Sequence, residues 1–134
     1  MSSPRMHRYS DKIVAMICHD TITGMQKAHE LMRLEGTDAV PAGPFMYLHP
    51  DLLDAAVEGV ARVRQLGGSL SARDHHDEWA AFLTARGWRC GPRDDEAKTH
   101  PNLVAWEGLS PEQQDKDRVF VGVVVSLTLD TGAG

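Results

Sequence analysis

Residues 88–106, WRCGPRDDEAKTHPNLVAW, lack the helical pattern of the rest of the sequence. The predicted fold depends on the secondary structure assigned to them. Gly91-Pro92 and His100-Pro101 interrupt any helix here, charged residues crowd the middle, and the apolar residues lie towards the two ends. This pattern is typical of a small β-hairpin or an ordered loop. On both sides of it, apolar residues recur at helical spacing, so helices are expected before and after this segment.

Three helices are expected before the segment, over residues 11–32, 50–66 and 72–86, with a loop at 36–49 between the first two. In the first two helices apolar residues recur every three or four positions, as in an amphipathic helix. Pro50 suits a first helical turn, and Ser71 with Asp74 three residues later forms a variant of the capping box. Gly87 supplies the left-handed conformation that commonly ends a helix.

A fourth helix is expected after residue 110, although the sequence there supports two interpretations. Ser110-Pro111-Glu112-Gln113 combines an N-cap hydroxyl, proline at the first helical position and glutamine at the third. The apolar and acidic residues with helical spacing are Asp117, Phe120, Val124 and Leu127. The residues that alternate as in a strand are Val119, Val121, Val123 and Val125, and β-branched residues favour strands. The capping signal decides the prediction in favour of a helix.

Length and charge restrict the classes of protein that fit. With 134 residues the chain holds one hydrophobic core, so we expect a single domain over 11–129 between flexible ends at 1–10 and 130–134. The net charge of −5 gives no overall positive field, so no DNA or RNA partner is expected. No apolar run reaches the ~18 to 20 residues of a membrane span, and no secretory signal is evident, so we expect no membrane partner and a cytoplasmic location. Cys18 and Cys90 are then expected to be free thiols.

Common enzyme motifs are absent from the sequence. It has no P-loop, no dinucleotide fingerprint, no His-Glu-x-x-His motif and no Gly-x-Ser-x-Gly nucleophile elbow. Cys90 lacks the second cysteine of a zinc deaminase, and the close pairs Cys18-His19 and His75-His76 are neighbours whose side chains diverge by about 100° on a helix. We therefore expect no catalytic residue, no metal and no cofactor.

Aromatic rings and cationic side chains are concentrated in one region. All three tryptophans lie between residues 79 and 106, and the slightly longer segment 73–106 contains five cationic residues and three histidines. Indole rings stack on nucleobases, and guanidinium and ammonium groups bind phosphate oxygens, so the region fits a nucleotide-like ligand. Tryptophans are equally typical of a core, and these basic residues alternate with acidic ones as on a solvated surface. The residues leave both interpretations open.

Two histidines in the sequence have distinctive neighbours. Pro101 restricts His100 to an extended or turn conformation and so fixes the direction of its imidazole. His100 then either presents a donor to a ligand or caps the neighbouring backbone. On the first helix, Cys18 is expected to be a small core residue and His19 a half-buried polar contact.

Several of these residues form a pattern that resembles the RyR domain, named after the repeats of the ryanodine receptor. The residues that carry the likeness are His76-Asp77-Glu78-Trp79, Gly87-Trp88-Arg89-Cys90-Gly91-Pro92-Arg93-Asp94, Lys98-Thr99-His100-Pro101-Asn102-Leu103-Val104, Leu109, Gln113 and Lys116-Asp117, with Ile17-Cys18-His19-Asp20 and Phe120 in support. The chain is most similar to small stand-alone RyR-domain proteins of bacteria and their phages. It departs from the family at Cys90, where an aromatic residue is usual, and at Ala105-Trp106, where Pro-Tyr is common.

The resemblance implies a mainly α fold in which about four helices pack around a short β-hairpin. Because the receptor repeats occur in pairs, it also implies a homodimer or higher homo-oligomer. It further implies a non-enzymatic module that binds a nucleotide-derived small molecule, such as an adenine nucleotide, an ADP-ribose derivative or a cyclic nucleotide. In a phage or prophage such a module would sequester an immune second messenger in the host cytoplasm.

The ligand site predicted from the sequence consists of His19, His76, Trp88, Arg93, Lys98, His100 and Trp106. Trp88 and Trp106 are expected to stack on the ligand. Arg93, Lys98 and His100 are expected to bind phosphate or ribose oxygens. Two alternatives use the same residues. One is a protein-interaction or assembly module in which the tryptophan and arginine side chains are interface anchors. The other is a nucleotide-modifying hydrolase with a histidine as acid or base.

Overall fold

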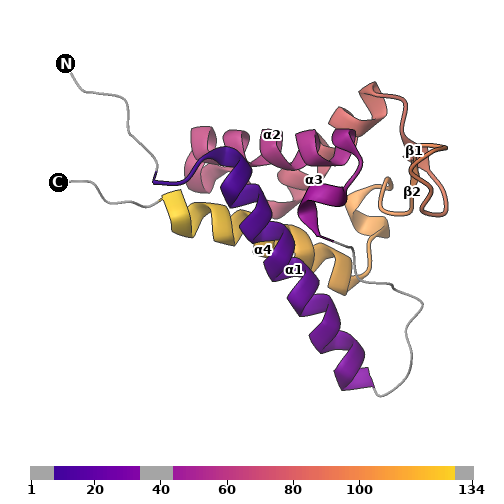
Figure 1. Cartoon of the computed structure of the whole chain (residues 1–134), viewed down its shortest axis with the longest axis horizontal. Helices are drawn as coiled ribbons and strands as arrows, with labels where there is room; N and C mark the ends of the chain where they lie inside the picture. The colour runs from indigo at the N-terminus through magenta and orange to yellow at the C-terminus, as the bar shows by residue number, and fades with distance from the viewer. Residues whose placement is uncertain (1–7, 34–43, 129–134) are drawn as a thin grey trace.

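The computed structural model describes residues 8–33 and 44–128 as a helical bundle with one small pair of strands (Figure 1). The elements in chain order are α1 (Asp11–Arg33), the 3₁₀ turn η1 (Phe45–Tyr47), α2 (Pro50–Leu66), η2 (Gly67–Ser69), α3 (Ala72–Ala85), β1 (Arg89–Cys90), β2 (Thr99–His100), η3 (Trp106–Gly108) and α4 (Pro111–Thr128). The expected mainly α fold is confirmed. Residues 1–7, 34–43 and 129–134, which include most of the expected flexible ends and much of the 36–49 loop, lie outside the described residues.

Local hydrogen bonds explain where two of the helices begin. At α3, Ser71 Oγ accepts from the Asp74 N–H at 3.0 Å and the Asp74 carboxylate accepts from the Ser71 N–H at 3.3 Å, which completes the capping box. At α4, Ser110 Oγ accepts from the Gln113 N–H at 3.2 Å. The valine-rich segment that follows is helical, as the cap predicted. Gly87, with φ of +93°, lies just beyond the end of α3.

Helix α4 packs against α1, α2 and α3 and so organises the main core. The fully or almost fully buried side chains at its contacts are Val14 and Cys18 of α1, Val60 and Val63 of α2, and Phe120 and Val124 of α4. The Cys18 thiol donates to the Phe120 carbonyl at 3.7 Å, and burial raises its pKa to about 12. Cys18 is therefore a core residue, as expected.

None of the described helices is long and apolar enough to cross a membrane.

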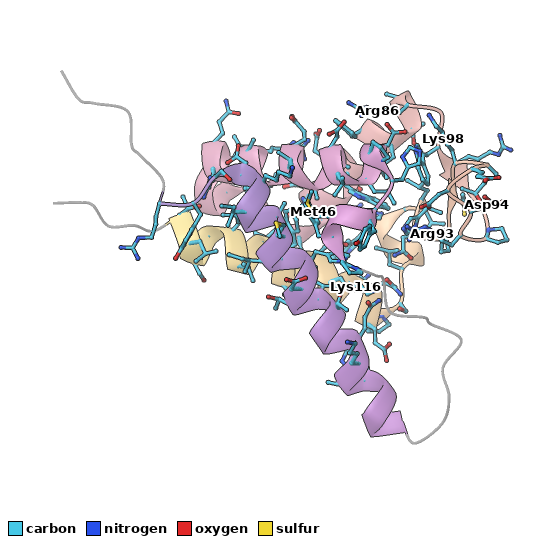
Figure 2. The ribbon with its side chains drawn as sticks, in the orientation of Figure 1. Met46, Arg86, Arg93, Asp94, Lys98 and Lys116 are labelled. Atoms are coloured by element: carbon cyan, nitrogen blue, oxygen red, sulfur yellow. The ribbon has the colours of Figure 1, made fainter. Side chains whose placement is uncertain are left out.

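The expected short two-stranded element lies at one end of the bundle (Figure 1). Arg89 pairs with Thr99 and Cys90 with His100, and the two strands are parallel. The chain reverses direction twice between them, and the second reversal is closed by an antiparallel bridge between Asp94 and Thr99. We call residues 89–100 the arm. Figure 2 shows Arg93, Asp94 and Lys98 on this arm, beyond the end of the helices.

Replacing Gly59 with alanine is expected to destabilise the protein, whereas the same change at Gly24 is expected to stabilise it. A Cβ at Gly59 would lie 2.9 Å from His75 Cε1 and 3.2 Å from Phe120 Cζ, on two buried rings that stack 4.2 Å apart. At Gly24 no heavy atom lies within 4 Å of the added carbon. Urea unfolding should show a loss of ~1–3 kcal/mol at Gly59 and a gain of ~0.5–1 kcal/mol at Gly24. Equal changes would contradict the packing of His75 against α2.

Candidate functional site

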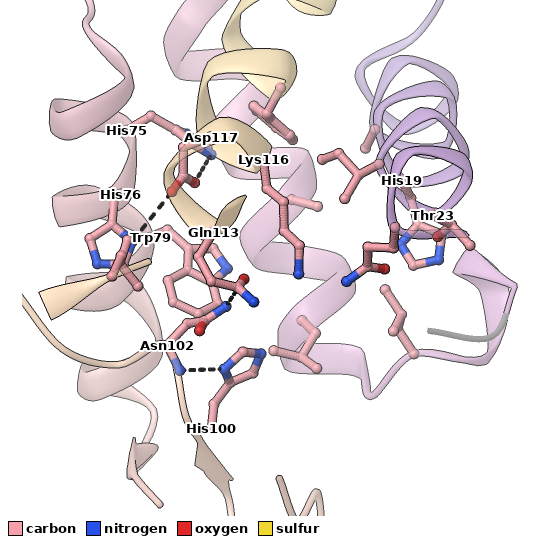
Figure 3. A pocket seen from close by; sticks show the side chains of 18 of the residues that line it. His19, Thr23, His75, His76, Trp79, His100, Asn102, Gln113, Lys116 and Asp117 are labelled. Atoms are coloured by element: carbon pink, nitrogen blue, oxygen red, sulfur yellow. Dashed lines mark hydrogen bonds and ion pairs between the residues drawn. The ribbon is translucent and has the colours of Figure 1, made fainter. Parts of the chain in front are cut away.

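A cavity of about 530 Å³ lies between α1, α2, α3, α4 and the arm (Figure 3). Its volume falls within the range of roughly 300–1,000 Å³ that is usual for small-molecule sites. Phe45, Leu48, Leu52 and Ala56 make part of its wall apolar, and the ring of Trp79 adds an aromatic surface. Polar and titratable side chains from α1, α3, α4 and the arm line the rest. One ligand could therefore contact apolar and aromatic surface as well as polar and charged groups.

One face of α4 supplies the central charge of the cavity. Gln113, Lys116, Asp117 and Phe120 lie three or four residues apart and line it together. Figure 3 shows the Lys116 amine directed into the cavity, and among the described residues no group forms a hydrogen bond or ion pair with it. Burial lowers the pKa of Lys116, and the Asp117 carboxyl partly opposes this effect. Lys116 is thus a half-buried cation without a hydrogen-bond or ion-pair partner in the part of the chain that is described.

His100 caps the neighbouring backbone, which is one of the two roles that the sequence left open. Its Nδ1 accepts from the Asn102 N–H at 3.0 Å, so the neutral imidazole carries its hydrogen on Nε2 and has that donor left for a ligand. Burial, followed by the charges of Arg93 and Lys116, lowers the pKa of His100 to about 4. The ring is therefore neutral at pH 7, and its edge packs against Trp79 with the centroids 5.1 Å apart.

Asp117 lies between two buried histidines at the α3 side of the cavity. Its carboxylate oxygens are 3.8 Å from His75 Nε2 and 3.7 Å from His76 Nδ1. Since His76 Nε2 must donate to the Val104 carbonyl at 2.7 Å, a neutral His76 turns a lone pair towards Asp117. Burial raises the pKa of Asp117 to about 6, with the His76 charge opposing this rise. Asp117 is therefore held beside both histidines at ion-pair distance, longer than a hydrogen bond.

Metal binding finds no support in these groups. Within residues 8–33 and 44–128, no cluster of three or more histidine, cysteine, aspartate or glutamate side chains has the arrangement of a metal site. The histidines instead pack on rings, His75 on Phe120 and His76 on Trp79.

Acid is expected to destabilise the native protein, with His75 as a main cause. Burial first, then the charges of Arg62 and His76, lower the pKa of His75 from 6.5 to about 3, so below pH 6.5 the unfolded chain takes up a proton that the native protein does not. His100 acts in the same direction, whereas the raised pKa of Asp117 acts against both. Because two histidines outweigh one carboxyl, we expect a free energy of unfolding ~2 kcal/mol lower at pH 5 than at pH 7.5.

The test is urea unfolding of the wild type and His75→Phe at both pH values. The variant should lose less stability on acidification than the wild type. The same loss in both proteins would contradict the burial of a neutral His75.

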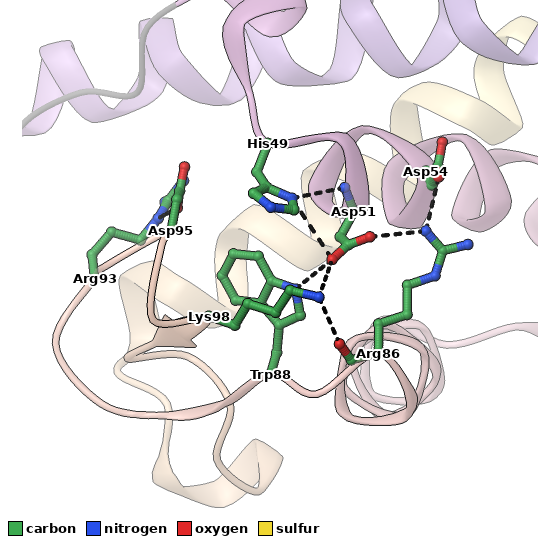
Figure 4. Close-up of polar contacts among 8 residues, drawn as sticks. All are labelled: His49, Asp51, Asp54, Arg86, Trp88, Arg93, Asp95 and Lys98. Carbon is green, nitrogen blue, oxygen red and sulfur yellow. Dashed lines mark hydrogen bonds and ion pairs between the residues drawn. The ribbon is translucent and has the colours of Figure 1, made fainter.

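The cavity brings together four of the seven residues predicted from the sequence. His19, His76, Arg93 and His100 line it. His19 comes from α1 and is half-buried beside the ring of Phe45, with the centroids 5.7 Å apart. Arg93 comes from the arm, where its Nε donates to Asp95 Oδ1 at 2.9 Å (Figure 4).

Trp88 and Lys98 lie outside the cavity and bind Asp51 of α2 instead (Figure 4). The Trp88 Nε1–H donates to Asp51 Oδ2 at 2.9 Å, and the Lys98 ammonium lies 3.2 Å from the same oxygen. The indole hydrogen bond first, with the Arg86 and Lys98 contacts, lowers the pKa of Asp51 to about 2. Trp88 is 2% exposed and packs against Leu83 in a second core cluster. Through these contacts with Asp51, both residues hold the arm against the helical bundle.

Lys98 has a backbone conformation that fits this anchoring role. Its φ of +57° is the only positive value at a non-glycine position among the described residues. The side chain also donates to the Arg86 carbonyl at 3.0 Å, which holds the turn of the arm against the end of α3.

Trp106 is also outside the cavity. Its ring centroid lies 6.1 Å from that of His76, and the Arg118 guanidinium lies over the same ring at 5.5 Å. Of the three tryptophans, Trp79 is the one that lines the cavity.

The polar and aromatic lining residues that sequence reasoning left out of the site include Trp79, Asn102, Gln113, Lys116 and Asp117. One signal was available for three of them. Gln113, Lys116 and Asp117 share the helix face that also carries the buried Phe120, so polar side chains occupy positions that face the interior.

The comparisons with known proteins give one match. A family model described as the RyR domain matches residues 61–132, from the second half of α2 to beyond the end of α4. No curated protein and no solved structure matches the chain. The matched residues make up more than half of the 134, and they include the arm and the cavity-lining faces of α3 and α4. The chain therefore belongs to the RyR-domain family.

Proposed function

We propose that the cavity binds a nucleotide-derived small molecule through an anionic group and an aromatic base. The observation that carries this proposal is the Lys116 ammonium, which faces the cavity without a partner among the described residues. Lys116 is half-buried, so its charge is partly desolvated at a cost, and an anionic ligand would supply the missing partner.

Groups beside Lys116 support an anion at this place. The charges of Arg93 and Lys116 both depress the pKa of His100, which puts all three residues within electrostatic reach of one another. Lys116 and Arg93 provide charge, while His100 provides its Nε2–H donor. A phosphate has enough oxygens to accept from all three.

Aromatic and apolar groups in the same cavity support a base. Trp79 offers a ring, and Leu48 and Leu52 offer adjoining apolar surface. Stacking on an aromatic side chain contributes about 1–3 kcal/mol per base. Together with two or three charge-assisted hydrogen bonds, this brings micromolar affinity within reach after the cost of association. The proposed role is to sequester such a molecule in the cytoplasm. If the protein is encoded by a phage or prophage, the molecule would be an immune second messenger of the host.

Calorimetric titration with adenine nucleotides, ADP-ribose and cyclic dinucleotides tests the proposal. We expect saturable binding of at least one member of this panel at micromolar to low millimolar concentration. No heat of binding from any of them at millimolar ligand would refute it.

A protein-interaction module is a second candidate, because two apolar side chains of η1 are exposed. Met46 is 52% and Tyr47 84% exposed, and they lie next to each other. Such a surface is suited to a second copy of this chain. If it holds a homodimer, Tyr47→Ser should shift the protein to the monomer in size-exclusion chromatography, while Trp88→Phe should not.

A nucleotide-modifying hydrolase is the third candidate, favoured by the raised pKa of Asp117 and by the position of its carboxylate 3.7 Å from His76 Nδ1. Mass spectrometry of each ligand after incubation with the protein separates turnover from binding. We favour binding because the described residues offer no activated nucleophile: burial raises the pKa of Cys18 to about 12.

A further inference from the structure

Two amide side chains form a pair at the wall of the cavity. Asn102, which follows the arm, and Gln113, in the first turns of α4, both line the cavity (Figure 3). The Asn102 Nδ2 donates to Gln113 Oε1 at 2.9 Å. This bond uses one donor and one acceptor, so Asn102 Oδ1 is left as an acceptor and Gln113 Nε2 as a donor, and neither has another partner among the residues described.

Hydrogen bonds of their own backbone N–H groups hold both residues in place. The Asn102 backbone N–H donates to His100 Nδ1 at 3.0 Å, and the Gln113 backbone N–H donates to the Ser110 cap at 3.2 Å. The two side chains therefore present their remaining donor and acceptor from a fixed backbone. Lys116 lies three residues after Gln113 on the same helix face, so the pair adjoins the proposed anion site.

The order of donor and acceptor in the pair is reversible. If both amides rotate by 180°, Gln113 donates to Asn102, and the free donor and acceptor exchange places. No contact in the described part of the chain favours one order over the other. The pair thus presents a free acceptor on one amide and a free donor on the other, in whichever order a ligand requires.

We propose that Asn102 and Gln113 together read the polar edge of the base, and that they require an adjacent donor and acceptor but accept either order. This inference rests on the proposed function and names the specificity residues of the same cavity. Adenine offers an amino donor beside the N1 acceptor, and hypoxanthine offers the O6 acceptor beside an N1–H donor, so both edges fit. A purine without a substituent at C6 offers only the N1 acceptor and leaves one amide group unpaired.

The first test is titration of the full chain with AMP, IMP and purine riboside 5′-monophosphate. We expect AMP and IMP to bind within ~3-fold of each other and the unsubstituted purine nucleotide to bind at least ~10-fold more weakly. Equal binding of all three would overturn this inference while leaving the proposed function intact. Failure of all three to bind would overturn this inference, and the proposed function would fall with it only if ADP-ribose and the cyclic dinucleotides also gave no heat of binding.

The second test removes the free donor from the pair. In Gln113→Glu the new carboxylate only accepts, so Asn102 must donate to it, and the free Asn102 Oδ1 and the second carboxylate oxygen both accept. The adenine and hypoxanthine edges each bring one donor and one acceptor, so each leaves its acceptor facing an acceptor, and the variant should bind both AMP and IMP at least ~10-fold more weakly than the wild type. Gln114→Glu is the matched control, because it adds the same charge one residue away: Gln114 donates to the Trp106 carbonyl at 3.0 Å and does not line the cavity, so both affinities should stay within ~3-fold of those of the wild type. Affinities in Gln113→Glu that match those of Gln114→Glu would overturn the inference.

Discussion

Trp88→Ala is expected to lose ~3–5 kcal/mol of stability, the largest effect of any single substitution considered for this protein. The ring is 2% exposed and packs in the second core cluster, so truncation leaves a cavity that the surrounding side chains fill only in part. Truncation also removes the 2.9 Å hydrogen bond from the indole to Asp51. Urea unfolding at pH 7.5 provides the measurement.

Two further variants separate packing from ligand contact at the tryptophans. Trp88→Phe keeps most of the ring and loses the indole hydrogen bond, so we expect a loss of ~1.5–3 kcal/mol with ligand affinity changed little. Trp106→Ala removes a half-buried ring and should cost less than Trp88→Ala. If Trp88→Phe abolished binding without unfolding the protein, the role assigned to Trp88 would be wrong.

Lys116→Gln is expected to weaken binding of a phosphate-bearing nucleotide by ~10- to 100-fold, which corresponds to the 1.5–3 kcal/mol of a charge-assisted hydrogen bond. Glutamine keeps much of the side-chain length but removes the ammonium. Because the half-buried ammonium has no hydrogen-bond or ion-pair partner among the described residues, its removal should leave stability unchanged or slightly higher. Calorimetric titration gives the affinity and urea unfolding the stability.

Arg118→Gln is the matched control, because it removes one positive charge from α4 two residues away. Arg118 does not line the cavity, and its guanidinium contacts Asp115 at 2.8 Å and the ring of Trp106. Its affinity should remain within ~3-fold of the wild type. Equal losses in the two variants would mean that the general charge of α4, and not the position of Lys116, determines binding.

The helices were predictable because their signals are local. Ser71 and Ser110 each lie three residues from the N–H that they cap, so the sequence contains both partners of each hydrogen bond. The valine alternation in 119–125 gave the opposite indication for α4. The helix prevails because Phe120 and Val124, one turn apart, fit the core between α1 and α2.

The site was only partly predictable because its partners are distant in sequence. Pro101 fixes His100 locally, and that residue was correctly expected to have a defined direction. Trp88 and Lys98 looked like ligand contacts because Asp51, which binds both, precedes them by 37 residues or more. No periodicity or spacing relates α2 to the arm. Only the packing of the helices identifies Trp79 as the ring at the cavity.

Tryptophan fluorescence during ligand titration tests most directly where the ligand lies. The structure assigns the cavity ring to Trp79 and places Trp106 outside, so the two variants Trp79→Phe and Trp106→Phe form a matched pair. With a nucleotide that binds the wild type, Trp106→Phe should keep the change in emission on saturation, and Trp79→Phe should lose most of it. An emission change that persists in Trp79→Phe and disappears in Trp106→Phe would contradict binding in this cavity.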